Sequence, residues 1–193
     1  LAPGSNQMYK DTGTPLAFLE PLVASGQLGV VFPYTPAFAL AYNARYQEQA
    51  LTHSNFKSYF YEGSDVGAIT ITGDFTAQNQ AEAQYVLACV YFLRACTKMQ
   101  WGTDADAGTP PPILKLNGYG MSYLPDVSVI VTNFTHTMPA EVDYISILRE
   151  PYNGVRIPVL SQISVTVQPV YSRKKLSDFN VRNYSSTGNG RFL

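Results

Sequence analysis

The fold depends on residues 79–101, NQAEAQYVLACVYFLRACTKMQW, the one stretch of the chain with a sustained helical pattern. Asn79 is a favourable N-cap, and Glu82 completes an Asn-x-x-Glu capping box that can satisfy two backbone donors at the start of a helix. Apolar residues recur along the stretch at spacings of three and four. We therefore expect one long, mostly buried helix over 79–101, ended by Gly102 in the left-handed conformation.

The segments on either side of this helix alternate apolar and polar residues, which is typical of half-buried β-strands. The alternation is clearest in 66–77, 127–138 and 156–170. Shorter segments of similar composition are also expected to be strands, namely 29–34, 38–50, 56–61, 113–116 and 142–149. For 38–50 a helix is the alternative, because Ala, Arg, Gln and Glu favour helices. Turn-forming residues predict turns at 52–55 and 63–65. We expect 127–138 and 142–149 to form an antiparallel hairpin.

A single helix among seven to nine strands excludes a doubly wound α/β fold, because that fold needs a helix for each crossover. The predicted class is mainly β (α+β), an antiparallel β-sandwich or partial barrel with the helix against one side. The predicted organisation is an N-terminal arm over 1–27, a β domain over 28–171 and a basic tail over 172–193. Within the arm, a short helical turn over 16–24 is an alternative to irregular structure.

The composition indicates a surface that is covered by other subunits. The 193 residues suffice for one domain with a full core. Charged residues make up only 14% of the chain, whereas soluble domains usually carry about a quarter. There are 14 Tyr and 10 Phe, and interface cores are rich in aromatic residues and poor in charges. A secreted all-β domain can have the same composition.

The charge is distributed unevenly along the chain. The net charge is −1, so there is no overall electrostatic reason to bind nucleic acid or an anionic membrane. The tail holds five basic residues and one acidic residue, a local charge of +4, which leaves −5 for residues 1–171. The tail alone cannot bury enough surface to fold, so we expect it to become ordered against a neighbour. Its candidate inter-subunit contacts are Arg173, Lys174, Lys175, Phe179 and Tyr184.

The cysteines and histidines do not form a recognisable site. Cys89 and Cys96 lie seven residues apart on the predicted helix, about 10 Å, which is too far for a disulfide. We expect both to be reduced core residues, as in a protein made in a cytoplasm. Together with His53 and His136 they lack the short spacing of a zinc site. The longest apolar run, residues 85–93, is too short to span a membrane.

The acidic residues and short motifs give no catalytic candidate either. Asp104 with Asp106, and Glu141 with Asp143, lie in or beside predicted loops, where such pairs are most often solvated. The sequence contains no Gly-x-Ser-x-Gly elbow, Walker A loop or Gly-x-Gly-x-x-Gly motif. We therefore expect no catalytic residue, no cofactor and no metal, and a protein that is not an enzyme.

Five segments in order resemble the baseplate tube-initiator proteins of contractile-tailed bacteriophages, which sit where the tail tube joins the baseplate. They cover roughly residues 53–179 and are most specific in the helix and its flanks. The segments are HSNF (53–56), ITITGDFTAQNQAEAQYVLACVYFLRACTKMQWG (69–102), PPPILKLNGYG (110–120), VIVTNFTHTMPAEVDYI (129–145) and VTVQPVYSRKKLSDF (165–179).

The resemblance implies a tail-tube fold that assembles as a hexameric ring, with long hairpins joined into a β-barrel around a central channel. Residues 38–50, 56–75 and 127–149 would then be candidates for the channel wall. The implied partners are copies of the chain, the tail-tube protein and a baseplate hub or other tube initiators. Genomic DNA would pass through without specific binding, and no membrane would be involved.

The same resemblance implies a location in the virion, in the phage tail and baseplate, after assembly in the host cytoplasm. Two other functions remain open at this point. One is the repeating tail-tube protein itself, with the same fold and different neighbours. The other is a soluble β-sandwich enzyme or carbohydrate-binding domain, whose exposed tyrosines would stack on a ligand.

Overall fold

The protein is mainly β, with 41% strand and 20% helix in a curled, antiparallel half-barrel arrangement, which confirms the predicted class. The computed structural model describes residues 10–11, 14–15, 17–24, 29–99, 101, 107–120, 123–148, 150 and 152–187. Near the N-terminus, β1 (Lys10–Asp11) pairs with β2 (Thr14–Pro15). The 3-10 helix η2 (Ala17–Leu19) and α1 (Glu20–Ala24) follow and confirm the helical turn considered for 16–24.

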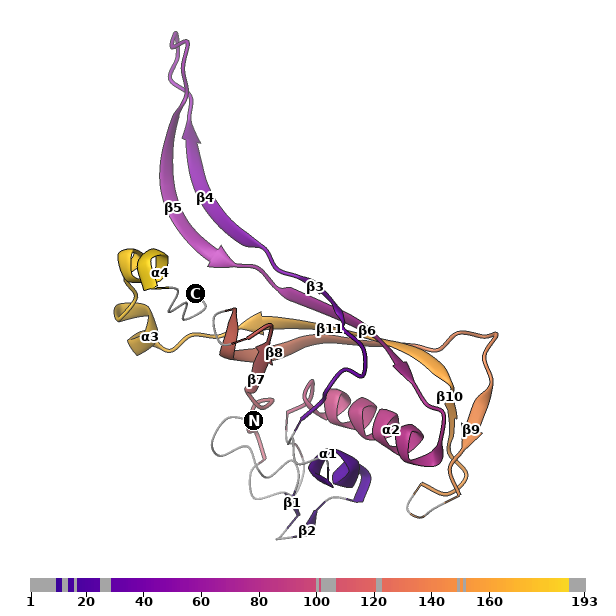
Figure 1. Cartoon of the computed structure of the whole chain (residues 1–193). Coiled ribbons are helices and arrows are strands. Elements are labelled where there is room, and N and C mark those ends of the chain that lie inside the picture. The colour runs from indigo at the N-terminus through magenta and orange to yellow at the C-terminus, as the bar shows by residue number, and fades with distance from the viewer. Residues whose placement is uncertain are drawn as a thin grey trace.

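The body is built on one five-stranded antiparallel sheet (Figure 1). Its strands, from one edge to the other, are β3 (Ala37–Ala39), β6 (Ile69–Thr76), β11 (Leu160–Pro169), β8 (Leu124–Thr137) and β7 (Leu114–Gly118). The central strand β11 pairs with β6 on one side and β8 on the other, with Val165 opposite Ile71 and Phe134. The sheet thus joins strands that are distant in sequence.

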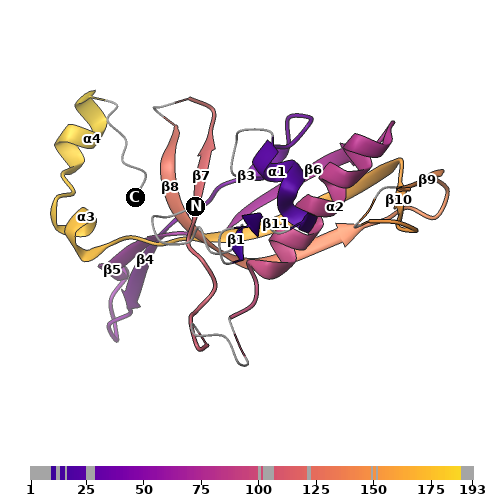
Figure 2. The ribbon, with the colours of Figure 1, turned by 90° about the horizontal axis from the view of Figure 1, so that it is seen from below.

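One face of this sheet is apolar and is covered by α2 (Gln80–Ala95), as Figure 2 shows from below. Ile163, Val165 and Val167 of β11 are buried there, while the residues between them point to the other, more polar face. The predicted alternation is confirmed by the burial pattern of β6, of residues 127–131 in β8 and of β11. Contrary to the prediction, residues 156–170 are not one long strand, because residues 156–158 belong to a separate two-stranded sheet. Each buried aliphatic side chain contributes about 1.5–3 kcal/mol relative to exposure.

The predicted start of the helix is confirmed, and its end lies earlier than expected. The Glu82 amide donates to Asn79 Oδ1 at 2.9 Å, and Glu82 Oε2 accepts from the Gln78 amide at 2.8 Å. The helix ends at Ala95 and not at 101. The Thr97 hydroxyl donates to the Arg94 carbonyl at 2.8 Å, which occupies an acceptor of the last turn. Gly102 lies outside the described residues.

Residues 29–34 are not a strand, contrary to the prediction. Here the backbone groups of Val31 are hydrogen-bonded by the Tyr85 hydroxyl of α2 and not by a neighbouring strand. The hydroxyl accepts from the Val31 amide at 2.8 Å and donates to the Val31 carbonyl at 2.9 Å. This segment is therefore attached to the helix through one side chain, and Pro33 could not have donated to a ladder.

The predicted hairpin between 127–138 and 142–149 is wrong. Of the described residues in 142–149, only Tyr144–Ser146 form a strand, β9, which pairs with β10 (Arg156–Pro158). The long strand β8 instead lies between β11 and β7. Strand partners distant in sequence are chosen by burial of the whole face, which a local pattern does not reveal.

The predicted turn at 63–65 is also wrong, because these residues lie inside β5 (Ser58–Val66). The chain runs from β3 into β4 (Tyr42–Gln49), turns, and returns through β5 into β6. Between the two strand pairs, the Gly67 amide donates to the Ala41 carbonyl at 2.8 Å. The two pairs therefore form one long ribbon, of which the β3–β6 part belongs to the five-stranded sheet.

Candidate assembly surface

The β4–β5 hairpin projects from the body as a curved two-stranded ribbon (Figure 1). Every residue of β4 is exposed, and in β5 only Gly63 and Val66 are not. In the described part of the chain, these two strands pair only with each other. An isolated two-stranded hairpin is only marginally stable in water, and among the described residues both outer edges of this ribbon are without a paired strand.

The loop at the tip, residues 50–57, confirms the turn predicted for 52–55. The Ser54 amide donates to the Leu51 carbonyl at 3.2 Å, and its hydroxyl donates to the Phe56 carbonyl at 2.8 Å. His53 adopts a left-handed conformation there, with φ of 64°. Phe56 is 84% exposed, so the tip carries an apolar group in solvent.

A β-bulge in β5 decides which side chains share a face of the hairpin. The register shifts between Arg45 and Tyr46, so that Glu62 has no residue opposite it in β4. Bulges also bend and twist a strand, which accounts for the curvature in Figure 1. After the shift, Tyr46 lies opposite Tyr61, and their ring centroids are 5.6 Å apart.

The two faces of the hairpin therefore differ in chemistry. We call one the tyrosine face; the register and the alternation of side chains assign to it Tyr42, Ala44, Tyr46, Glu48, Tyr59, Tyr61, Ser64 and Val66. We call the other the polar face; it carries Asn43, Arg45, Gln47, Gln49, Ser58, Phe60, Gly63 and Asp65. On the polar face, Arg45 Nε lies 3.5 Å from Asp65 Oδ1. That face has no net charge.

A cluster of tyrosines lies at the base of the hairpin. Burial, together with the nearby Tyr184 and Tyr123 and a hydrogen bond with Tyr184, raises the pKa of Tyr42 to about 12. Burial and the nearby Tyr42 likewise raise the pKa of Tyr171 to about 12. The Tyr171 hydroxyl is buried without a hydrogen-bond partner among the described residues. The C-terminal tail thus reaches the base of the tyrosine face.

The tail consists of two short helices, α3 (Arg173–Ser177) and α4 (Val181–Thr187). Ser172 caps α3 by accepting from the Lys175 amide at 3.3 Å. No residue of α3 is buried. Four apolar residues of the tail are exposed by 42–67%: Leu176, Phe179, Val181 and Tyr184. The tail therefore carries apolar surface that the body does not cover.

The structure brings together two of the five predicted contact residues. The Phe179 and Tyr184 rings are 6.0 Å apart, and Tyr184 joins the cluster at Tyr42. The basic residues Arg173, Lys174 and Lys175 are exposed. Within the described ranges, none of these three makes an ion pair. The tyrosines of the hairpin are the functional candidates that the sequence did not identify, although their alternation in β4 was a visible signal.

The cysteines and histidines, which could act as nucleophiles or metal ligands, do not form a common site among the described residues. Cys89 and Cys96 are free and buried, as expected, and burial raises the thiol pKa of each to about 12. His53 is in the hairpin tip, whereas His136 is on β8. Burial, followed by the nearby Arg94, lowers the pKa of His136. Among the described residues, no group of three or more His, Cys, Asp or Glu could hold a metal ion.

Only one of the two predicted carboxylate pairs lies within the described residues. Asp104 and Asp106 lie outside the described residues, and Glu141 and Asp143 are exposed in the connection between β8 and β9. The Asp143 carbonyl accepts from the Val159 amide at 2.8 Å, which attaches that connection to the start of β11. Of the helices that the structure describes, none has the length and apolar character needed to cross a membrane.

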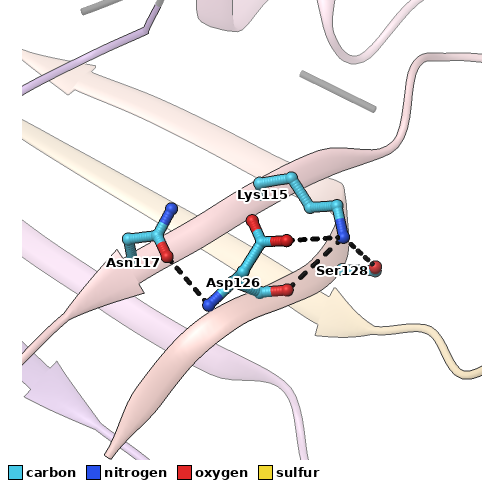
Figure 3. Close-up of polar contacts among 4 residues, drawn as sticks. All are labelled: Lys115, Asn117, Asp126 and Ser128. Atoms are coloured by element: carbon cyan, nitrogen blue, oxygen red, sulfur yellow. Dashed lines mark hydrogen bonds and ion pairs between the residues drawn. The ribbon is translucent and has the colours of Figure 1, made fainter. Parts of the chain in front are cut away.

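A polar network on β7 and β8 has a structural role (Figure 3). Lys115 Nζ lies 3.2 Å from Asp126 Oδ2 and 3.0 Å from Ser128 Oγ. Asn117 Oδ1 accepts from the Asp126 amide at 2.8 Å, and Asp126 has a left-handed φ of 52°. The network therefore stabilises the bulge near the end of the β7–β8 pair, where the register shifts.

A cavity of about 140 Å³ lies between α2 and the sheet. Its lining is apolar apart from Lys115, and it includes Phe32, Phe92 and Leu116. Ligand sites usually combine an apolar lining with several convergent polar groups. This cavity lacks such a group of polar side chains, so the hairpin and the tail remain the candidate functional surface.

Comparison with known proteins adds no family to this description. No protein-family model matches the chain, and no curated protein matches it.

Proposed function

We propose that this protein is a structural, non-enzymatic subunit of a contractile phage tail, a baseplate tube initiator that forms a ring around the DNA channel. Its neighbours would be other copies of the chain, the first tail-tube ring and the baseplate hub. The proposal rests on the resemblance of residues 53–179 to baseplate tube initiators and, above all, on one structural observation: the exposed β4–β5 hairpin.

The hairpin supports a ring because both of its outer edges carry unpaired backbone groups. Strands from neighbouring copies can add to these edges by main-chain hydrogen bonds, and closing the ring removes exposed edges altogether. The 8 residues of β4 and the 9 residues of β5 extend a total of 17 strand residues into solvent. Such a long exposed hairpin is not expected of a protein that acts as a monomer. The hairpin is therefore a fragment of a larger barrel.

In this proposal the polar face of the hairpin lines the channel. Amide and hydroxyl groups dominate that face, and its one basic residue, Arg45, is paired with Asp65. Phosphate contacts by unpaired Lys and Arg side chains dominate non-specific DNA binding. A wall without such side chains lets DNA pass without being held.

The test is electron microscopy of the purified full-length protein over a range of concentrations, with particles classed for symmetry. Closed rings with a central channel, able to start tubes of a second protein, are the expected result. Long tubes made of this chain alone would assign it to the repeating tail-tube protein instead. A protein that remains monomeric at every concentration would overturn the proposal and favour the soluble enzyme or carbohydrate-binding alternative.

A further inference from the structure

Two surfaces of this chain are incompletely covered, and their chemistry is complementary. The tyrosine face presents Tyr46, Tyr59 and Tyr61, each about 60% exposed. The tail presents its four exposed apolar residues, which include Phe179 and Tyr184. Aromatic and aliphatic side chains of this kind form the cores of protein interfaces.

The charges of the two surfaces are also complementary. The tyrosine face carries Glu48, and the exposed Glu62 lies in the bulge of β5. Glu48 already pairs with Lys57 at the tip. The tail carries the exposed basic residues of α3 and Arg182 of α4. Residues 42–66 of the hairpin hold three acidic and two basic residues, a net charge of −1, so a basic tail is weakly attracted to this aromatic ribbon.

Within one copy, the tail is seen at the base of the tyrosine face, where Tyr184 meets Tyr42. Four residues further along β4, Tyr46 lies about 13 Å away at 3.3 Å per residue. The seven residues of α4 span only about 10 Å. The tail of the same copy therefore leaves the outer part of the face exposed, while its own apolar residues remain exposed as well.

We infer that the tail of a second copy, residues 172–187, docks on the tyrosine face of the β4–β5 hairpin and continues the contact that Tyr184 begins at its base. This inference deepens the proposed function and rests on it for the presence of a ring. Such a contact joins two different patches on identical chains, so it is heterologous, and a series of such contacts closes into a ring when the rotation permits.

Crosslinking of full-length variants that each carry one added cysteine tests this contact. The variants are Tyr46→Cys on the tyrosine face, Gln47→Cys on the polar face and Val181→Cys in the tail, with a short bismaleimide as the probe. All three positions are exposed. The native thiols of Cys89 and Cys96 are buried, and maleimides react with thiolates, so these two residues stay unmodified in the folded protein.

The variants are mixed above the assembly midpoint of the mixture, because loss of the Tyr46 ring weakens association. We then expect a covalent dimer when Tyr46→Cys is mixed with Val181→Cys, and none with either variant alone. The matched mixture of Gln47→Cys with Val181→Cys should give about tenfold less dimer, because neighbouring residues of a strand point to opposite faces. In the double variant, Tyr46→Cys with Val181→Cys, the contact predicts a ladder of covalent oligomers. An internally crosslinked monomer alone, or equal yields in the two mixtures, would overturn the inference.

The failure of this inference and that of the proposed function are distinguishable. Rings seen by electron microscopy without the Tyr46-dependent crosslink would reject the tail contact and leave the proposed function standing. The crosslink without any closed ring or channel would support the tail contact and reject the proposed function.

Discussion

Replacing Tyr46 by Ala tests the assembly surface most directly, because this side chain belongs to the proposed interface and not to the core. Tyr46 is 58% exposed, and an aromatic side chain offers about 200 Å², so roughly 120 Å² is available for burial by a neighbour. At about 25 cal/mol per Å², complete burial would contribute ~3 kcal/mol to each contact. Loss of that contribution weakens association by about 100-fold.

The assay is sedimentation velocity over a concentration series, with thermal unfolding measured in parallel. The substitution removes the ring contact with Tyr61, 5.6 Å between centroids, worth about 0.5–1.5 kcal/mol. Both residues lie outside the hydrophobic core cluster. We therefore expect the melting temperature to fall by a few degrees at most and the assembly midpoint to lie at about 100-fold higher concentration.

Gln47→Ala is the matched control, since Gln47 adjoins Tyr46 in β4 and lies on the polar face. It should leave the assembly midpoint close to that of the unmodified protein, because the polar face is proposed to line the channel and not to be covered by a neighbour. Equal shifts for the two variants, or assembly of Tyr46→Ala at the original concentration, would refute the assignment of the tyrosine face as the covered side.

Five further outcomes are expected. Gly73→Ala should lower the free energy of unfolding by about 1–3 kcal/mol in a denaturant titration, because its Cβ would lie 2.4 Å from an aromatic ring. Gly63→Ala, which meets no atom within 4 Å, should be neutral. Asn79→Ala should cost about 1 kcal/mol in the same assay by removing the helix cap, and an unchanged midpoint would contradict the cap. Burial raises the pKa of Cys89 from 9.0 to about 12, so the folded state favours the neutral thiol. The stability that this contributes is complete below pH 9 and is lost as the pH rises toward 12. The free energy of unfolding measured at a series of pH values tests this. Deleting residues 172–193 should leave a folded subunit, measured by thermal unfolding, since no residue of α3 is buried. It should also abolish ring or tube assembly, and unaffected assembly would remove the role of the tail.

The local features of the fold could be predicted from the sequence because they depend on neighbours within a few residues. Asn79 and Glu82 cap the helix that their spacing predicts, although Glu82 completes the box through the Gln78 amide. The alternation around Ile163 and Val165 correctly identifies the buried face of β11. These signals arise from the periods of helix and strand, which the chain carries in its own order.

The arrangement of the candidate surface was decided by tertiary structure. The bulge at Glu62 shifts the register of β5, and only that shift places Tyr59 and Tyr61 on one face with Tyr46. The hydroxyl of Tyr85 replaces a strand beside Val31, a pairing between residues 54 positions apart. A sequence carries the composition and period of each segment. Which segments meet, and in which register, depends on the free energy of burying all of them together.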